Sequence, residues 1–181
     1  MPADPFRRLT QASAAHLEQL MRASPAPPLQ ALVGLEWRGY NTSWQPRVLG
    51  IQKFIKGFFL VDGQVEGYNI PVAQNGPDAP WLHLPTRENP RRYAFYCVTP
   101  VNRASRDNLY PEALLLDYGT SNRNADSPAI AKRLRDYLVQ PDRANPDLLL
   151  GKAYMALGPL RLPSNFFILE RLCATTWQPT D

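Results

Sequence analysis

The sequence predicts a mainly β domain in which antiparallel strands close into a barrel around a lumen. From Trp37 onward, short segments rich in β-branched and aromatic residues follow one another, separated by Gly and Pro. Two of these segments are separated by Asp62-Gly63, a strong hairpin signal because both central residues of a type I′ turn need positive φ. Trp37 stands in the first segment and Arg171 in the last, and the first and last strands of a meandering barrel are neighbours. These observations together predict closure.

Length and composition predict one domain. The chain has 181 residues, of which 44% are hydrophobic and 20% charged, so it can bury a sizeable core. We expect residues 1–28 to form a helix and linker, and residues 32–175 to form the barrel. No apolar run approaches the roughly 18 residues of a membrane span, and the N-terminus lacks the apolar core of a signal peptide. A cytoplasmic protein without a membrane span is therefore expected.

The net charge of +4 comes mostly from arginine, as in high-GC bacterial sequences, and the basic residues are dispersed. Arginine suits carboxylates and phosphates, so an anionic small molecule is a plausible partner. Arg91 and Arg92 beside Tyr93 resemble part of a single-stranded nucleic-acid groove. However, acidic residues interleave with them, and no dense basic patch forms. We therefore expect no nucleic-acid partner.

The N-terminal segment predicts one helix from Asp4 or Pro5 to about Ala23. Its apolar residues recur at helical spacing, and its start is acidic, as helix N-termini prefer. The proline-rich segment 24–28 ends it, and a short helical turn is expected at 29–33. Strands are then expected at 36–43, 47–52, 54–61, 64–73, 81–84, 91–99, 112–119, 147–157 and 164–175.

One further helix is expected over about 128–139, before the last two strands. Ser127-Pro128 has the pattern of an N-cap followed by proline at the first helical position. The apolar residues after it follow helical spacing. We expect this helix to cover a barrel end or to cross its outside.

Trp37 and Arg171 are the candidates for barrel closure. If the first and last strands pair, the guanidinium can lie on the indole face, a contact worth roughly 0.5–2 kcal/mol. Direct contact with a ligand is the alternative role for this pair.

Three motifs carry a resemblance to a known family. They are Gly34-x-x-Trp37-Arg38-Gly39, Leu149-Leu150-Gly151-Lys152-Ala153 and Phe166-Phe167-x-Leu169-Glu170-Arg171. Together they resemble the bacterial barrels of the GXWXG type and, more distantly, lipocalins and fatty-acid-binding proteins (calycins). The resemblance covers about residues 32–172, and Gly34 stands one residue further from Trp37 than the pattern expects. It implies a lipocalin-like barrel with a lumen for a small hydrophobic or amphipathic molecule.

Polar and aromatic residues within the strands are the candidate ligand-binding residues. Lys56 alternates with Phe54 and Phe58, and the opposite set of that strand is equally apolar, so both faces are expected to be covered. The alternative for Lys56 is a surface lysine that carries its charge to water. The expected ligand-binding set is Arg38, Lys56, Phe58, Arg92, Tyr118, Lys152 and Tyr154.

Asp117 and Glu66 are the acids expected to be partly buried, and Tyr96 is a candidate partner for proton transfer. Burial would raise the pKa of either carboxyl group, and a nearby Lys or Arg would lower it. The alternative is a solvent-facing residue or an ion pair with Lys152 or Arg92. A cross-strand pair between Lys152 and Glu170 is also expected if the last two strands pair in that register.

No metal or cofactor is expected. His16 and His83 belong to no cluster with metal-ligand spacing. The alternative roles for His83 are those of a general base or a haem ligand. Cys97 and Cys173 lie in apolar runs, which favours reduced buried thiols.

The predicted function is binding of a small hydrophobic or amphipathic molecule with an anionic end in the lumen. An enzyme on the same barrel is the main alternative: a cyclase, isomerase or chromophore lyase that needs no metal. A third alternative is an interaction barrel whose apolar outer face forms a homodimer.

Overall fold

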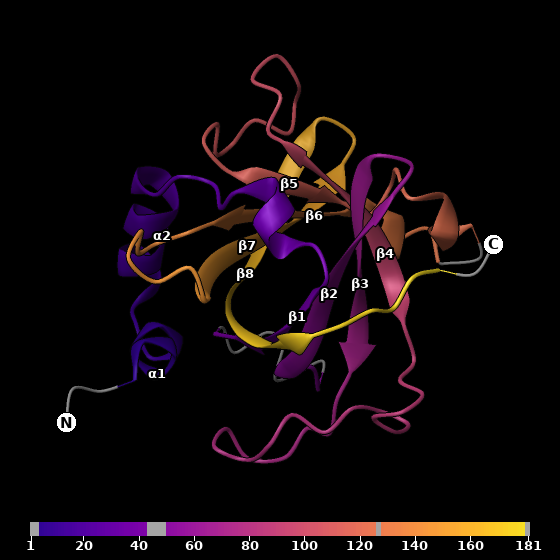
Figure 1. Ribbon diagram of the computed structural model, residues 1–181. Helices are drawn as coiled ribbons and strands as arrows, with labels where there is room; N and C mark the ends of the chain where they lie inside the picture. Colours follow the sequence, from indigo (N-terminus) through magenta and orange to yellow (C-terminus); the bar gives the residue numbers. More distant parts are fainter. Residues whose placement is uncertain (1–3, 43–49, 126–127, 180–181) are drawn as a thin grey trace.

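The computed structural model describes residues 4–42, 50–125 and 128–179. Within these ranges the chain forms a closed antiparallel barrel in which each strand pairs with the next and β1 with β8 (Figure 1). The strands are β1 (Leu35–Asn41), β2 (Lys53–Val61), β3 (Gln64–Pro71), β4 (Tyr93–Pro100), β5 (Leu114–Asp117), β6 (Leu134–Val139), β7 (Leu148–Leu157) and β8 (Leu160–Ala174). The predicted fold class is confirmed, and an eight-stranded antiparallel barrel is compatible with a lipocalin-like fold.

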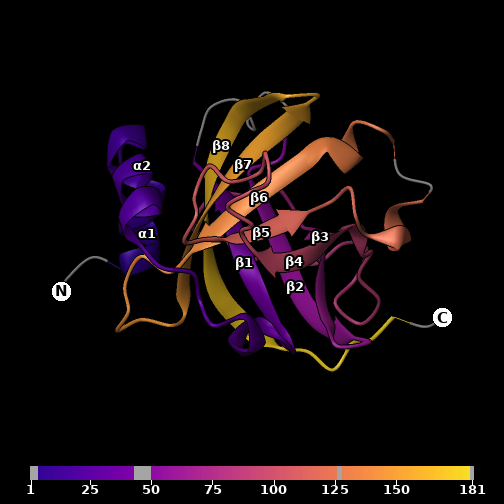
Figure 2. The ribbon, with the colours of Figure 1, turned by 90° about the horizontal axis from the view of Figure 1, so that it is seen from above.

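The predicted N-terminal helix is present, but it is divided into α1 (Pro5–Thr10) and α2 (Ala14–Ala23). The division has a local cause, because the Ser13 side chain accepts a hydrogen bond from the His16 amide and so caps a new helix. Both helices lie outside the barrel, α1 against β8 and α2 against β7 (Figure 2). No helix in the described ranges is long and apolar enough to cross a membrane.

One end of the barrel is covered by the segment between α2 and β1. Its 3-10 turn η1 (Leu29–Leu32) matches the turn expected there. The carbonyl of Pro25 accepts a hydrogen bond from Gln140 beside β6, and the Gly34 amide donates to Phe58 in β2. Leu32, which is 1% exposed, packs with the interior side chains. This segment therefore spans the end of the barrel at which β1 begins.

The Asp62-Gly63 hairpin between β2 and β3 is confirmed, with φ of 50° and 75° at the two residues. Two of the predicted strands, 47–52 and 81–84, are not confirmed. Residues 47–49 of the predicted strand 47–52 lie outside the described residues, and residues 50–52 are not in a strand. Segment 81–84 forms only an isolated bridge, between His83 and Val72.

The predicted helix over 128–139 is wrong for most of its length. The chain makes one 3-10 turn, η3 (Ala131–Arg133), after an earlier one, η2 (Asn122–Asn124), and then enters strand β6. Leu134 and Leu138 of β6 pack inside the barrel, and Tyr137 packs outside it. Both faces of this strand are therefore covered by apolar side chains. Apolar residues on both faces hide the two-residue period, and hydrogen bonding to β5 and β7 then decides the conformation.

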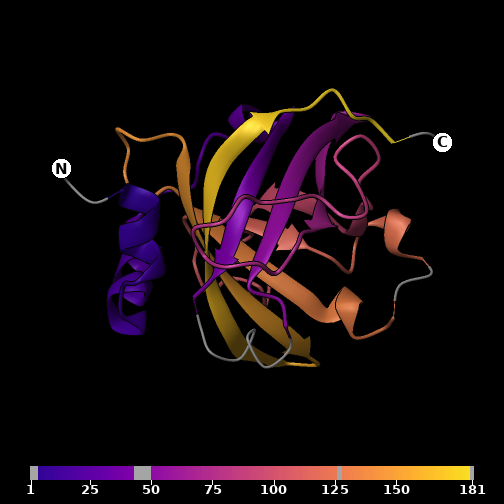
Figure 3. The same cartoon turned by 90° about the horizontal axis from the view of Figure 1, so that it is seen from below.

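The buried side chains form two layers, one inside the barrel and one between the strands and the elements packed on them. Side chains of α1 and α2 belong to the outer layer, and the two helices lie beside the barrel (Figure 3). Aromatic rings of both layers lie over glycines of the neighbouring strands. The pairs are Phe54 on Gly39, Tyr68 on Gly57, Tyr96 on Gly67 and Phe167 on Gly151. The glycines therefore leave the space that these rings occupy.

Candidate functional site

A buried polar cluster occupies the interior of the barrel. The Lys56 ammonium lies 2.6 Å from the Tyr118 hydroxyl, 3.1 Å from Asn69 Oδ1 and 3.1 Å from Asp136 Oδ2. The Tyr118 hydroxyl donates to Asp136 at 2.9 Å, and the Asn69 amide donates to the carbonyl of Ala94. We call Lys56, Asn69, Tyr118 and Asp136 the interior polar cluster.

Aromatic rings surround the ammonium group of this cluster. Lys56 Nζ lies 4.6 Å from the centre of the Tyr96 ring and 5.2 Å from that of Tyr118. The rings of Phe54 and Phe167 follow at 5.7 and 5.4 Å. A cation attracted to ring faces and paired with one carboxylate is stabilised in a place that water does not reach.

Burial controls the proton affinities here. Desolvation lowers the pKa of Lys56, although Asp136 opposes the shift through its charge and its hydrogen bond. Desolvation also raises the pKa of Tyr118 and Tyr96 well above the usual range, and the negative charge of Asp136 adds to this effect. The cluster thus combines an amine that loses its proton more readily with phenols that hold theirs.

The end of the barrel opposite η1 is bordered by exposed apolar side chains. The hairpin of β7 and β8 continues past the barrel there, and Met155 and Leu157 of β7 face Leu162 and Leu160 of β8. Met155 and Leu157 continue the inner face of β7 by strand alternation. A register shift in β8 between Phe166 and Pro163 brings Leu162 and Leu160 to the same face. Leu160 and Leu162 are 59% and 47% exposed. We call these four residues the hairpin strip.

A second polar cluster lies on the outer face of β1 and β3. Glu36, which is buried, accepts a hydrogen bond from the Tyr68 hydroxyl at 2.9 Å and lies 3.3 Å from His83 Nε2. Arg92 lies 3.8 Å from the same carboxylate and stacks over Trp177. These contacts attach the segment after β3 and the C-terminal segment to the barrel wall, which is a structural role.

Tyr68 makes the stability of this outer cluster depend on pH. Burial raises its pKa from 10.0 to about 12, with Glu36 adding to the shift and a hydrogen bond from Arg92 opposing it. The folded protein therefore holds this proton more tightly than the unfolded chain, so the contribution to stability is complete below about pH 10 and is lost toward pH 12.

We expect Tyr68→Phe to lose less stability than the wild type over this pH range, as measured by urea unfolding. Buried tyrosines such as Tyr96 and Tyr118 titrate in both proteins, so some loss remains in the variant. Equal losses in the two proteins would show that Tyr68 does not carry this dependence.

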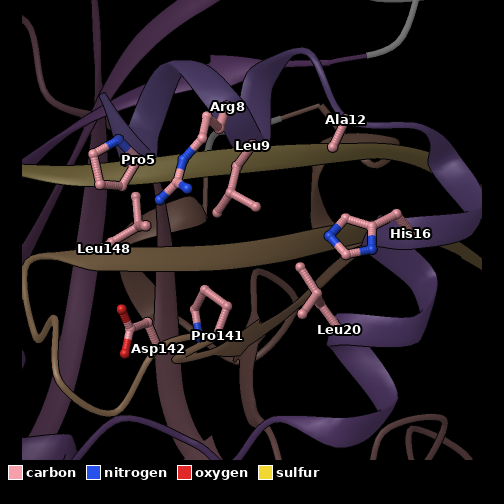
Figure 4. Close-up of a pocket in the computed structure, with 9 residues that line it drawn as sticks. All are labelled: Pro5, Arg8, Leu9, Ala12, His16, Leu20, Pro141, Asp142 and Leu148. Atoms are coloured by element: carbon pink, nitrogen blue, oxygen red, sulfur yellow. The ribbon is translucent and has the colours of Figure 1, made fainter. Parts of the chain in front are cut away.

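A groove also lies outside the barrel, between α1, α2 and the connection from β6 to β7 (Figure 4). Its volume of about 300 Å³ is at the lower end for small-molecule pockets. It is lined by Pro5, Arg8, Leu9, Ala12, His16, Leu20, Pro141, Asp142 and Leu148. Arg8 and His16 are exposed, so this groove offers a shallow, solvated surface rather than an enclosed site.

The structure brings four of the predicted site residues together in the interior. Lys56, Tyr96 and Tyr118 make the contacts described above, and Phe58 lies edge to face on Tyr96 at 5.8 Å between ring centres. The alternation predicted for Lys56 is confirmed, because both faces of β2 are covered. Lys56 is 2% exposed and is therefore not a surface lysine.

The other predicted ligand-binding residues lie on the outer face, at separate places. Arg38 pairs with Glu170 and stacks over Phe6 of α1 at 4.7 Å. Arg92 belongs to the second polar cluster described above, beside Glu36. Lys152 binds Glu18 of α2 at 2.6 Å, so the predicted pair of Lys152 with Glu170 is wrong. Tyr154 is in hydrogen-bond contact with Tyr110 at 3.0 Å.

Asp117 and Glu66 also lie on the outer face, away from Tyr96. Both are register partners of Cys97, which stands between them on β4. Asp117 pairs with Arg135 at 2.9 Å and Glu66 with Arg123 at 3.6 Å. Burial raises the pKa of Asp117, and Arg135 opposes the shift. The three predicted catalytic residues are thus not gathered in one place.

Trp37 and Arg171 are register partners on β1 and β8, so the predicted pairing of the first and last strands is confirmed. The Arg171 guanidinium, however, donates to Asp147 at 2.9 Å, and its side chain is 48% exposed. The cation–π contacts found among the described residues do not include this arginine with Trp37. Trp37 itself is buried among the interior side chains.

Sequence reasoning missed Asp136 and Asn69, which complete the interior polar cluster. Asn69 carried a usable signal, because it is the register partner of Lys56 beyond the Asp62-Gly63 hairpin. Asp136 carries no such signal, because the spacing of the apolar residues around it predicts a helix. Lys53 was also missed; its ammonium is buried against the carbonyls of Ala79 and Pro80 and ties that loop to β2.

Within the described ranges, no three His, Cys, Asp or Glu side chains are grouped as ligands of a metal ion. Cys97 and Cys173 are free and partly buried. The chain matches no family model, no curated protein and no solved structure.

Proposed function

We propose that the barrel binds a small, mostly apolar molecule in its interior, with one polar group of the ligand directed at Lys56. The interior polar cluster is the observation that supports this most directly. A buried ion pair is often no more stabilising than apolar residues of the same volume, so stability alone does not explain why Lys56 and Asp136 are placed inside the barrel. A few polar groups enclosed by aromatic rings are typical of ligand sites.

The hairpin strip supports entry from the end opposite η1. Its leucines expose apolar surface next to the interior, where a hydrophobic molecule first contacts the protein. The interior itself is filled by side chains, with the rings of Phe54 and Phe167 packed edge to face at 5.9 Å. Binding therefore requires these two rings to move aside.

The charge balance of the cluster favours an uncharged polar group on the ligand over an anionic one. Asp136 already neutralises Lys56 at 3.1 Å, and a carboxylate brought to Lys56 would also meet the charge of Asp136. Like charges in a desolvated place repel strongly. A carbonyl or hydroxyl oxygen can instead accept from Lys56 or Tyr118 without this cost.

Native mass spectrometry with fatty acids, fatty alcohols, retinoids and tetrapyrroles tests this proposal. We expect a one-to-one complex with an uncharged amphipathic compound. The double variant Lys56→Met/Asp136→Leu should lower the affinity for this compound about tenfold or more, because a hydrogen bond to a charged group contributes about 1.5–3 kcal/mol. Arg8→Ala in the outer groove is the matched control and should leave binding unchanged. Loss of binding only in the Arg8 variant would place the site in the groove.

An enzyme acting in the same interior is a second candidate, favoured by the direct contacts among Lys56, Tyr118 and Asp136. Protons can pass along such a chain, as an isomerase, cyclase or lyase requires. Chromatography of the bound compound after incubation would separate the two functions. For an enzyme, Tyr118→Phe should still bind the compound but should form less product.

Three other sequence-based expectations stay predictions. They are the relation to the GXWXG-type family, the cytoplasmic location and the homodimer. Size-exclusion chromatography with light scattering tests the last of these.

A further inference from the structure

We propose that Lys56 captures carbonyl compounds covalently, as an imine, so that the ligands of the barrel include apolar aldehydes. This inference rests on the proposed function, because the carbonyl compound must first enter the interior. It goes beyond that function by assigning a reaction to one atom, Lys56 Nζ.

The surroundings of Lys56 suit an amine that reacts. Lysine in an apolar site more readily supplies the neutral amine that attacks a carbonyl carbon. Burial acts in this direction on the pKa of Lys56. The rings of Tyr96, Phe54 and Phe167 exclude water, which would otherwise hydrolyse the imine.

The neighbouring groups supply the proton transfers that imine formation needs. The amine nitrogen of Lys56 forms a bond to the carbonyl carbon, and the carbonyl oxygen takes up a proton. Loss of water from this adduct then forms the C=N bond, so the balance is amine plus aldehyde giving imine plus water. Asp136, whose Oδ2 lies 3.1 Å from Nζ, can first take a proton from the Lys56 ammonium and leave the neutral amine that attacks. Tyr118, at 2.6 Å from Nζ, is then placed to donate to the carbonyl oxygen, and Asp136 can return the proton to Tyr118 along their hydrogen bond. The water that leaves takes one proton from the nitrogen, so the lysine ammonium and the aldehyde give the protonated imine and water.

Asp136 also stabilises the product. The protonated imine carries the same positive charge as the lysine ammonium, at nearly the same place. Asp136 Oδ2, 3.1 Å from Nζ, remains its counter-ion. The reaction therefore leaves the buried charge balance of the barrel unchanged.

The three other lysines of the chain do not have an interior ammonium group beside both a tyrosine hydroxyl and a carboxylate. Lys53 is buried, but its ammonium is held by backbone carbonyls on the outer face. Lys152 is paired with Glu18, and Lys132 donates to the carbonyl of Ala125 near the surface. Lys132 and Lys152, which are partly exposed, are internal controls, because any lysine that solvent reaches also reacts slowly with an aldehyde.

Reductive trapping with octanal tests the inference, with 1-octanol as a matched compound that cannot form an imine. The wild-type protein is incubated with octanal and sodium cyanoborohydride, and its intact mass and peptide map are measured. We expect one adduct, with the mass of octanal less water plus two hydrogens, located on Lys56. Lys56→Arg should lose it, and Lys53→Arg should keep it.

The outcomes separate this inference from the proposed function. If octanal and octanol both bind but no adduct forms on Lys56, imine formation is wrong and ligand binding stands. If neither compound binds and no adduct forms, both proposals fail for this class of ligand. Adducts spread evenly over Lys132, Lys152 and Lys56 would also overturn the inference. The peptide map of the wild type decides this even if Lys56→Arg does not fold.

Discussion

Replacing Asp136 with leucine is expected to destabilise the barrel by about 3–5 kcal/mol, because it leaves the Lys56 ammonium buried without its counter-ion. Both side chains are almost fully buried, at 2% and 6% exposed. Water therefore cannot take over the role of the carboxylate. Urea unfolding followed by circular dichroism measures the loss.

The double variant Lys56→Met/Asp136→Leu is the control that isolates the charge. It removes both charged groups and fills their places with apolar side chains of similar volume, so it should recover most of the stability lost in Asp136→Leu. Arg103→Ala, at the exposed pair of Arg103 with Glu112, should cost less than about 1 kcal/mol. If the double variant is no more stable than Asp136→Leu, the loss comes from packing and not from the unpaired charge.

Gly151→Ala is expected to destabilise the barrel by about 1–3 kcal/mol through overpacking. A Cβ atom at this position would lie 2.1 Å from the ring of Phe167, which is buried and cannot move away freely. Thermal or urea unfolding measures this loss.

Gly76→Ala is the matched control for this substitution. A Cβ atom at Gly76 meets nothing within 4 Å, so the same change should be close to neutral there. Shortening the ring partner should also relieve the clash. Phe167→Leu is therefore expected to cost less in the Gly151→Ala background than in the wild type. Equal costs in both backgrounds would contradict the packing explanation.

The candidate site was predictable only in part. Alternation in β2 identified Lys56, because it places the lysine among large apolar residues on one face of a strand. Asp136 was hidden, because the spacing of Leu134, Tyr137 and Leu138 fits a helix as well as a strand buried on both faces. Asp117 and Glu66 looked equally buried in the sequence, yet they lie outside the barrel and pair with arginines.

The order and type of most elements follow from the sequence by itself. Turn chemistry at Asp62-Gly63, proline after the first helices and alternation along the strands are local signals, and they act over a few residues. They predict an antiparallel barrel with one N-terminal helix, which the structure divides into α1 and α2.

Only the tertiary structure decided which charges meet. Lys56, Tyr118 and Asp136 lie on different strands or at their ends, far apart in the sequence, and the register of the closed sheet brings them together. Residues 134–139 form a strand because their backbone groups hydrogen-bond to β5 on one side and to β7 on the other in the closed sheet. Such pairings depend on the whole barrel and leave no local pattern in the chain.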